Sequence, residues 1–204
     1  MAEIRPYRAV IYSEARRLIL GGDVLLHRPT KHLMSRLIGE HGGGPIPYSH
    51  AALAAWWGDI AFLLETLQWA GAHAVTLSSQ VEQNPGHYDV YRVRPPYAAA
   101  AAVDEMLRIT GTPYGWRSLG MAALRHVPIL KHLVGRTNPK WPPMCSQAVG
   151  RACRAGRADP LPGRDEAEIE PWQLGVPEFA EYQFTLFWSA GQMPLEPMRS
   201  ESVQ

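Results

Sequence analysis

Two residues that are far apart in the sequence could form a thiol nucleophile and its base. Cys145 stands at the expected start of a helix, shortly after two prolines, and His50 opens an apolar stretch that is typical of a strand. The thiolate is the form of cysteine that attacks a carbonyl carbon, so a neighbouring imidazole would activate the thiol by removing its proton. Free N–H groups at a helix start would also favour the negative sulfur. This pair predicts nucleophilic catalysis.

The local context distinguishes this pair from the other cysteine and the other histidines. Cys153 lies among alanines inside the same expected helix, which predicts a small, inert buried thiol. Of the 8 histidines, His50 alone follows a short polar segment, Tyr48-Ser49, and precedes an apolar strand that would hold its ring in place. A histidine beside such a strand is also commonly structural, and the sequence leaves that alternative open.

Glu65 is the candidate for a third residue that orients the imidazole. It lies inside the apolar stretch 60–67, where an ionised carboxylate is costly unless it is paired. A hairpin of 50–57 with 60–67 would bring its side chain close to His50, where it could hold the ring in the required tautomer. A solvent-facing glutamate on an edge strand is the alternative. The spacing of the histidines at 27, 32 and 41 fits no metal motif, so we expect no metal and no cofactor.

The elements that must position these residues alternate between β-type and helical patterns. We expect strands at 24–27, 50–57, 60–67, 73–77, 87–93 and 182–188, and helices at 13–20, from Thr30 to Ile38, at 97–109, at 116–134 and at 145–155. This order predicts an α+β fold with a mainly antiparallel sheet packed against helices. Residues 1–191 are expected to form a single domain, and residues 192–204 a disordered tail.

Composition excludes several classes of protein. With 204 residues, 46% of them hydrophobic, the chain is typical of one globular domain, and a net charge of +1 gives no argument for a nucleic-acid partner. If one helix carries both cysteines, they lie roughly 12 Å apart, too far for a disulfide. No stretch reaches the roughly 18 to 20 apolar residues of a membrane span, and no signal peptide is evident. We therefore expect cytoplasmic synthesis, with later delivery by lysis, a phage particle or a secretion machine left open.

Six motifs occur in a fixed order between Gly21 and Gly156. They are Gly22-Asp23-Val24-Leu25-Leu26, His32-Leu33-Met34-Ser35-Arg36-Leu37-Ile38, Tyr48-Ser49-His50-Ala51-Ala52-Leu53, Leu64-Glu65-Thr66, Gly111-Thr112-Pro113-Tyr114-Gly115 and Met144-Cys145-Ser146-Gln147-Ala148-Val149. Together they resemble the permuted NlpC/P60 cysteine peptidases, the YiiX/YebB-like branch of the papain-like superfamily. Ordinary NlpC/P60 members run Cys then His, whereas this branch runs His then Cys, as this chain does. Met144 and Gln147 depart from the usual aromatic and acidic residues of the last motif.

The resemblance implies a circularly permuted papain-like fold and a cysteine hydrolase that needs no cofactor. Cys145 would attack the carbonyl, His50 would act as base and then acid, Glu65 would orient His50, and the Cys145 backbone N–H would contribute to an oxyanion hole. The implied substrate is an amide bond in a cell-wall peptide such as peptidoglycan, or a similar amide. The residues expected to contact it are Tyr48, Ser49, Tyr114 and Ser146. A packing role is equally compatible with the two tyrosines.

Three other functions remain compatible with the sequence. A lipid acyltransferase or amidase of the related papain-like group would share the order His then Cys, but it usually has a second histidine in place of Glu65, and only His73 could serve here. A catalytically idle binding or virion-structural module could keep the fold without the chemistry. A deamidase or deconjugase acting on protein inside the cell would use the same residues on a different amide.

Overall fold

A computed structural model describes residues 8–30, 47–117, 119–120, 138 and 141–189. Within these residues seven strands form one sheet in the order β1-β7-β6-β2-β3-β4-β5. The strands are β1 (Ala9–Ile11), β2 (Val24–His27), β3 (His50–Trp57), β4 (Ile60–Leu67), β5 (Gly71–Thr76), β6 (Tyr88–Val93) and β7 (Ala180–Phe187). The edge strand β1 runs parallel to β7, and the other pairs of neighbouring strands are antiparallel, so the sheet is mixed.

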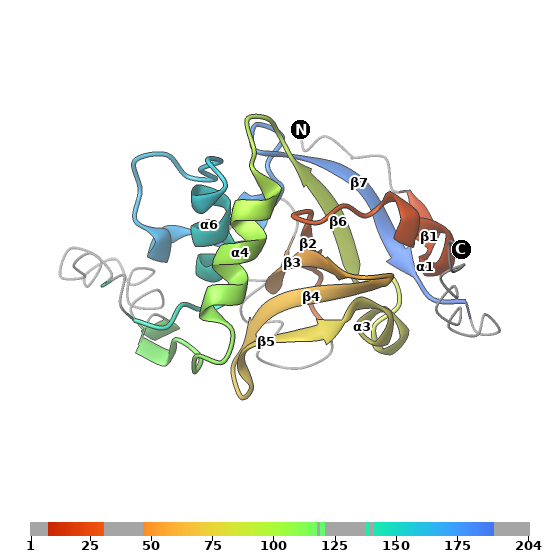
Figure 1. Ribbon diagram of the computed structural model, residues 1–204, viewed down its shortest axis with the longest axis horizontal. Helices are drawn as coiled ribbons and strands as arrows, with labels where there is room; N and C mark the ends of the chain where they lie inside the picture. Colours follow the sequence, from red (N-terminus) through yellow and green to blue (C-terminus); the bar gives the residue numbers. More distant parts are fainter. Residues whose placement is uncertain (1–7, 31–46, 118, 121–137, 139–140, 190–204) are drawn as a thin grey trace, which may run out of the picture.

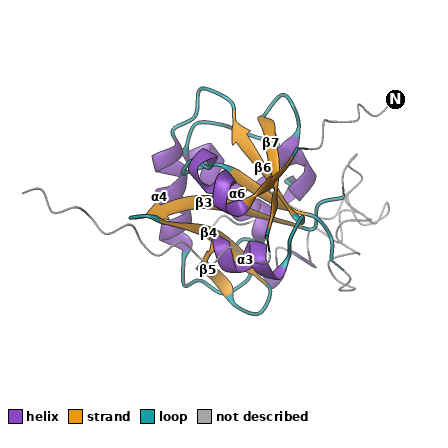
Figure 2. Ribbon diagram, turned by 90° about the vertical axis from the view of Figure 1, so that its right-hand side faces the viewer, coloured by secondary structure: helices purple, strands orange, loops and turns teal. Residues whose placement is uncertain are grey.

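Helices cover both faces of this sheet (Figures 1 and 2). The helices are α1 (Tyr12–Ala15), α3 (Leu77–Gln83), α4 (Ala99–Ile109) and α6 (Cys145–Ala155), with short 3₁₀ helices η1 (Arg16–Leu18), η2 (Glu166–Glu168) and η3 (Pro171–Gly175). In Figure 1, α4 and α6 lie side by side to the left of the central strands, and α1 and α3 lie to the right. The chain is therefore α+β, as the sequence predicts. None of the described helices is long and apolar enough to cross a membrane.

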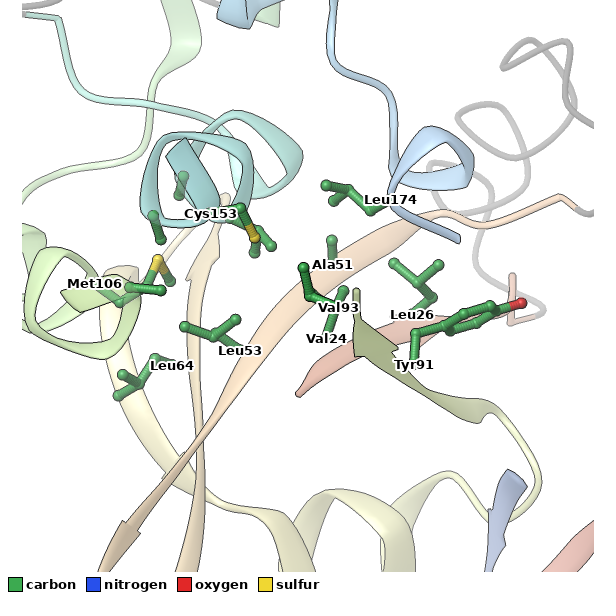
Figure 3. Close-up of a cluster of buried hydrophobic side chains, with 14 of the residues drawn as sticks. Val24, Leu26, Ala51, Leu53, Leu64, Tyr91, Val93, Met106, Cys153 and Leu174 are labelled. Atoms are coloured by element: carbon green, nitrogen blue, oxygen red, sulfur yellow. The ribbon is translucent and has the colours of Figure 1, made fainter. Parts of the chain in front are cut away.

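The core under α4 and α6 follows from the alternation of side chains along β3. Ala51 and Leu53 point to the face that these two helices cover, and Met106 of α4 and Cys153 of α6 point from the helices toward the same sheet face (Figure 3). Cys153 belongs to a buried stripe of α6 in which residues recur at helical spacing: Ala148, Val149, Ala152 and Cys153. Because β3 presents mostly alanines, α6 can lie close to it, which brings the first turn of α6 to the start of β3.

A second core lies on the opposite face of the sheet. Ala52 and Ala54 of β3 contribute to it, together with Leu77 and Val81 of α3. Buried hydrophobic side chains therefore cover both faces of the sheet. His50, the first residue of β3, is held between these packed layers. This packing holds the start of β3 and the start of α6 as neighbouring rigid elements.

The sequence predicted most of the elements that carry the candidate site. β2, β3, β4 and α6 have the bounds expected from the sequence, β5 begins two residues earlier, and β6, β7 and α4 differ by one or two residues at their ends. The strand β1, the helix α3 and the 3₁₀ helices η2 and η3 were not predicted. The predicted helix from Thr30 to Ile38, most of that at 116–134 and the tail at 192–204 lie outside the described residues.

Candidate active site

Cys145 is the first residue of α6, as the two preceding prolines predict. Met144 is extended (φ −82°, ψ 176°), and its N–H donates to the Gln147 Oε1 at 3.2 Å, which caps the helix start. The Cys145 side chain is almost fully buried and accepts backbone hydrogen bonds from Ala51 and Ser146. Because Cys145 begins the helix, its own N–H has no acceptor within the helix. The sulfur therefore lies where a negative charge meets several N–H donors.

His50 connects this thiol to a buried carboxylate. Its Nε2 lies 2.7 Å from the Oε2 of Glu65, whose side chain is only 2% exposed. The register pairs Ala52 with Glu65, so Glu65 is the diagonal neighbour of His50 across the β3–β4 hairpin, as the sequence predicted. His50 also forms a side-chain hydrogen bond with Cys145. Since Nε2 is engaged by the carboxylate, Nδ1 is the ring nitrogen left to face the thiol.

His73 contacts the other oxygen of the same carboxylate. It pairs directly with Glu65 across β4 and β5, and its Nε2 lies 3.4 Å from the Glu65 Oε1. Its Nδ1 lies 3.0 Å from the Gly71 carbonyl oxygen, which only a protonated Nδ1 can bond. A neutral His73 would then turn a lone pair toward the carboxylate, so protonation is favoured and the pKa of His73 is raised, chiefly by Glu65. The sequence gives one signal for this contact: Glu65 and His73 lie equally far from Trp69, which stands in the turn between the two strands.

The charges in this group shift one another's titration. Burial alone would raise the pKa of Glu65, but the hydrogen bond from His50 and the ion pair with His73 lower it to about 2. Burial would lower the pKa of His50, but Cys145 and Glu65 raise it to about 10. Burial would raise the pKa of Cys145, but His50 and the backbone donors hold it below its ordinary value. The favoured state is a thiolate beside an imidazolium that Glu65 stabilises.

The pKa values of Cys153 and His27 are shifted in the opposite direction from those of Cys145 and His50. Burial raises the pKa of Cys153 to about 12, so this thiol stays protonated at neutral pH. His27 pairs with His50 across β2 and β3, and its ring stacks on His87 at 5.6 Å. Burial and the neighbouring charge of His50 lower the pKa of His27 to about 3. His27 therefore stays neutral and adds no second cation beside His50.

Tyr48 takes part in a buried polar network at the start of β3. Its hydroxyl donates to the Asp89 Oδ2 at 2.6 Å and lies 2.8 Å from the Tyr91 hydroxyl. Arg28 binds both oxygens of Asp89, at 2.9 and 3.0 Å. These contacts brace the segment directly before His50. The Tyr48 hydroxyl is thus engaged by two partners within the protein. Its predicted contact with substrate stays a prediction.

The two predicted serines are also engaged within the protein. The Ser146 hydroxyl donates to the Ile169 carbonyl oxygen at 2.6 Å, and the Ser49 hydroxyl donates to the His27 carbonyl oxygen at 3.4 Å. Each bond uses the one proton that a hydroxyl can donate. Their role in substrate binding therefore stays a prediction, and the structure accounts for both as residues that anchor α6 and β3.

Tyr114 lies close to the entry to α6, because its neighbour Gly115 packs tightly against the residues before that helix. A Cβ atom on Gly115 would lie 2.2 Å from the Pro142 carbonyl oxygen and 3.0 Å from the Met144 nitrogen, so only glycine fits there. Burial and the Cys145 thiolate raise the pKa of Tyr114, whose hydroxyl bonds to the Gln68 side chain. Of the two predicted tyrosines, Tyr114 is the one whose titration the Cys145 thiolate influences.

Comparisons with known proteins include a distant structural neighbour. No protein-family model matches the chain, and no curated protein matches it in sequence. The solved structure of the metalloprotein YiiX from Escherichia coli O157:H7 is 15% identical, with a TM-score of 0.45, over 67% of this chain and 65% of that one. The chain therefore matches somewhat less than two thirds of the length of YiiX. Within the described part of the chain, no group of three or more His, Cys, Asp or Glu is arranged to hold a metal ion.

The shifted pKa of Glu65 predicts how stability depends on pH. A carboxylate whose pKa falls from 4.5 to about 2 on folding stabilises the protein above pH 4.5, and this contribution is lost as pH falls toward 2. Glu65→Gln removes it, so the difference in unfolding free energy between wild type and variant should be about 3 kcal/mol larger at pH 7 than at pH 2. Urea unfolding of both proteins across this range measures the difference.

Glu105→Gln is the matched control for this measurement. Glu105 pairs with Arg108 at 2.6 Å on the surface of α4, where solvent screens the interaction. The free energy of unfolding of Glu105→Gln should change with pH nearly as that of wild type does. Equal pH dependence in wild type and Glu65→Gln would contradict the paired, ionised state of Glu65.

Proposed function

We propose that this chain is a cysteine hydrolase that cleaves an amide bond through Cys145, His50 and Glu65. The observation that carries the proposal is the unbroken series of contacts from thiol to imidazole to carboxylate, in which His50 and Glu65 are 2.7 Å apart. Each residue comes from a different rigid element, and the thiol lies at a helix N-terminus. Nucleophile, base and orienting group are the three parts that thiol catalysis requires.

The reaction follows from the protonation states. The Cys145 thiolate attacks the carbonyl carbon of the amide, and the oxygen of the tetrahedral intermediate becomes negative. The Cys145 backbone N–H, which has no acceptor in the helix, stabilises this oxygen. The imidazolium of His50 then gives its proton to the leaving amine, which leaves a thioester on Cys145. His50, now neutral, takes a proton from water, and the resulting attack on the thioester releases the acid and restores the thiolate.

Glu65 performs the third task in this scheme. Its Oε2 accepts the Nε2–H of His50 and thereby presents Nδ1 to the sulfur in the tautomer that can exchange a proton. Because Glu65 is buried and ionised, it also stabilises the imidazolium that the first step needs. His73 holds the second oxygen of the carboxylate and so limits its rotation.

A circularly permuted papain-like arrangement accompanies this proposal. Support comes from the chain order, with the histidine strand β3 and the carboxylate strand β4 preceding the cysteine helix α6, and from the packing of α6 on β3. The proposed substrate is the amide of a peptide, with peptidoglycan as one source. The chemistry requires neither a metal nor a cofactor.

The test is the pH dependence of Cys145 alkylation by iodoacetamide. In wild type the reactive thiolate should titrate well below the ordinary value of about 8.5, because His50 and the helix start stabilise it. In His50→Ala the pKa of this thiol should move upward, because the imidazolium that stabilises the thiolate is gone. Peptide mass spectrometry reads Cys145 and Cys153 separately in the same sample.

Cys153 serves as the internal control, since its buried thiol should stay unreactive throughout the neutral range. An ordinary thiol at Cys145 that is indifferent to His50 would contradict the proposal. That result would favour a binding module that keeps the fold without the chemistry.

A further inference from the structure

A second imidazole lies directly beside His50 and has no task in the reaction as described so far. His27 pairs with His50 across β2 and β3. Residues that are directly opposite each other project from the same face of a sheet, with Cβ atoms roughly 5 Å apart. The carboxylate of Glu65 reaches His50 from β4, which lies on the other side of β3 from β2. His50 therefore has the carboxylate on one side and the ring of His27 on the other.

Ring contacts fix the position of His27. Tyr88 pairs with His27 across β2 and β6, and the two rings meet edge to face at 4.7 Å. The ring of His87 stacks on His27 at 5.6 Å. Tyr88 is itself buried, and its hydroxyl donates to the Gln80 Oε1 at 3.1 Å. His27 is thus held beside His50 as firmly as the elements that carry the site.

The nitrogens of His27 can take a ligand. Within the described part of the chain, neither ring nitrogen of His27 has a hydrogen-bond partner. His27 is half-buried, and the side chain of His50 is 14% exposed, so both rings reach the surface at the same place. A polar group in such a position is ordinarily paired with water or with a bound molecule.

The protonation state of His27 favours water as this partner. Burial and the charge of His50 lower the pKa of His27 to about 3, so the ring is neutral in the neutral range. A neutral imidazole has one N–H donor and one lone pair, whereas an imidazolium can only donate. His27 can therefore accept a hydrogen bond from a water molecule whose other proton is directed at His50.

We infer that His27 orients the water molecule that hydrolyses the thioester on Cys145. The inference rests on the proposed function, in which His50 takes a proton from water after the amine has left. One O–H bond of this water breaks and its proton goes to His50, while the water oxygen bonds to the acyl carbon and the carbon–sulfur bond breaks. The products are the carboxylic acid, the Cys145 thiolate and the His50 imidazolium. The second O–H of the water donates to the lone pair of His27, which stays neutral.

The experiment measures the two halves of the reaction separately. With protein in excess over p-nitrophenyl acetate, release of p-nitrophenolate reports acetylation of Cys145, and the mass of acid-quenched protein reports the loss of the acetyl group. His27→Phe keeps a ring against Tyr88 and His87 but has no nitrogen. Its acetylation should stay within about twofold of wild type, and its acetyl loss should slow about tenfold, as expected for one lost hydrogen bond. His27→Gln, whose amide both donates and accepts, should recover part of the rate.

Two controls separate water orientation from a structural effect. His87→Phe removes the imidazole that stacks on His27 and whose Nδ1 lies 3.3 Å from the Arg28 carbonyl oxygen, and it should leave both rates unchanged. Hydroxylamine attacks a thioester without needing an oriented water molecule. It should therefore remove the acetyl group from His27→Phe as fast as from wild type.

Each outcome has a separate meaning. Slow acetyl loss in His27→Phe with unchanged acetylation, recovered in part by His27→Gln and fully by hydroxylamine, supports the inference. Equal acetyl loss in wild type and His27→Phe, acetylation slowed as much as acetyl loss, or an equal effect of His87→Phe would overturn the inference and leave the proposed function intact. No acetylation of Cys145 in wild type would overturn both.

Discussion

Cys145→Ala should lower the hydrolysis of p-nitrophenyl acetate by about 10³-fold or more, to the level of the uncatalysed reaction. The variant keeps His50, Glu65 and the helix start, so it removes the nucleophile and little else. Without the sulfur no acyl-enzyme can form, and the imidazole has no partner whose attack it can assist. Initial rates of p-nitrophenolate release, with intact-protein mass to detect the acyl-enzyme, measure the loss.

Cys153→Ala is the control that the chain itself offers. Both cysteines lie on α6 and both are buried, but only Cys145 has the imidazole and the helix start beside it. Cys153→Ala should hydrolyse the ester at close to the wild-type rate. Near-full activity in Cys145→Ala, or an equal loss in the two variants, would show that the reaction depends on some other group.

The elements around the site could be predicted because their signals are local. β3 and β4 are continuous apolar stretches separated by the short turn Gly58-Asp59, and two prolines precede α6. β1 and α3 lack such signals. β1 has three residues and is a strand only because it pairs with β7, which is more than 160 residues away. The seven-residue helix α3 has no side-chain cap, and only Leu77 and Val81 mark its buried face.

The same distinction applies to the residues of the site. The contact of His50 with Glu65 follows from one hairpin, and the hairpin is a local feature. The contact of Glu65 with His73 depends on the register between β4 and β5. The strand β5 begins at Gly71, two residues earlier than the sequence predicted. The bond from Tyr48 to Asp89 needs β2 to lie between β3 and β6, a neighbour relation that no local pattern contains.

His50→Ala should lower ester hydrolysis by about 10² to 10⁴-fold, the range over which general acid–base catalysis acts. The double variant Cys145→Ala/His50→Ala should lose no more than Cys145→Ala alone, because nucleophile and base act as a unit. A double-mutant cycle from four rate constants measures this coupling. Multiplicative losses, in which the double variant is slower by the product of the two single effects, would contradict the assignment of His50 as the base.

The pH profile of the wild-type protein tests the same pair independently. As pH rises, the rate should first increase when the thiol loses its proton to form the thiolate–imidazolium pair, below the ordinary thiol range because the pKa of Cys145 is lowered. With a peptide amide, whose leaving amine must be protonated, it should fall again only toward pH 10, where His50, whose pKa is raised to about 10, loses the proton that the amine needs. In Glu65→Gln the alkaline limb should move to lower pH, because the carboxylate no longer stabilises the imidazolium. An alkaline limb that stays in place in Glu65→Gln would show that Glu65 does not act through His50.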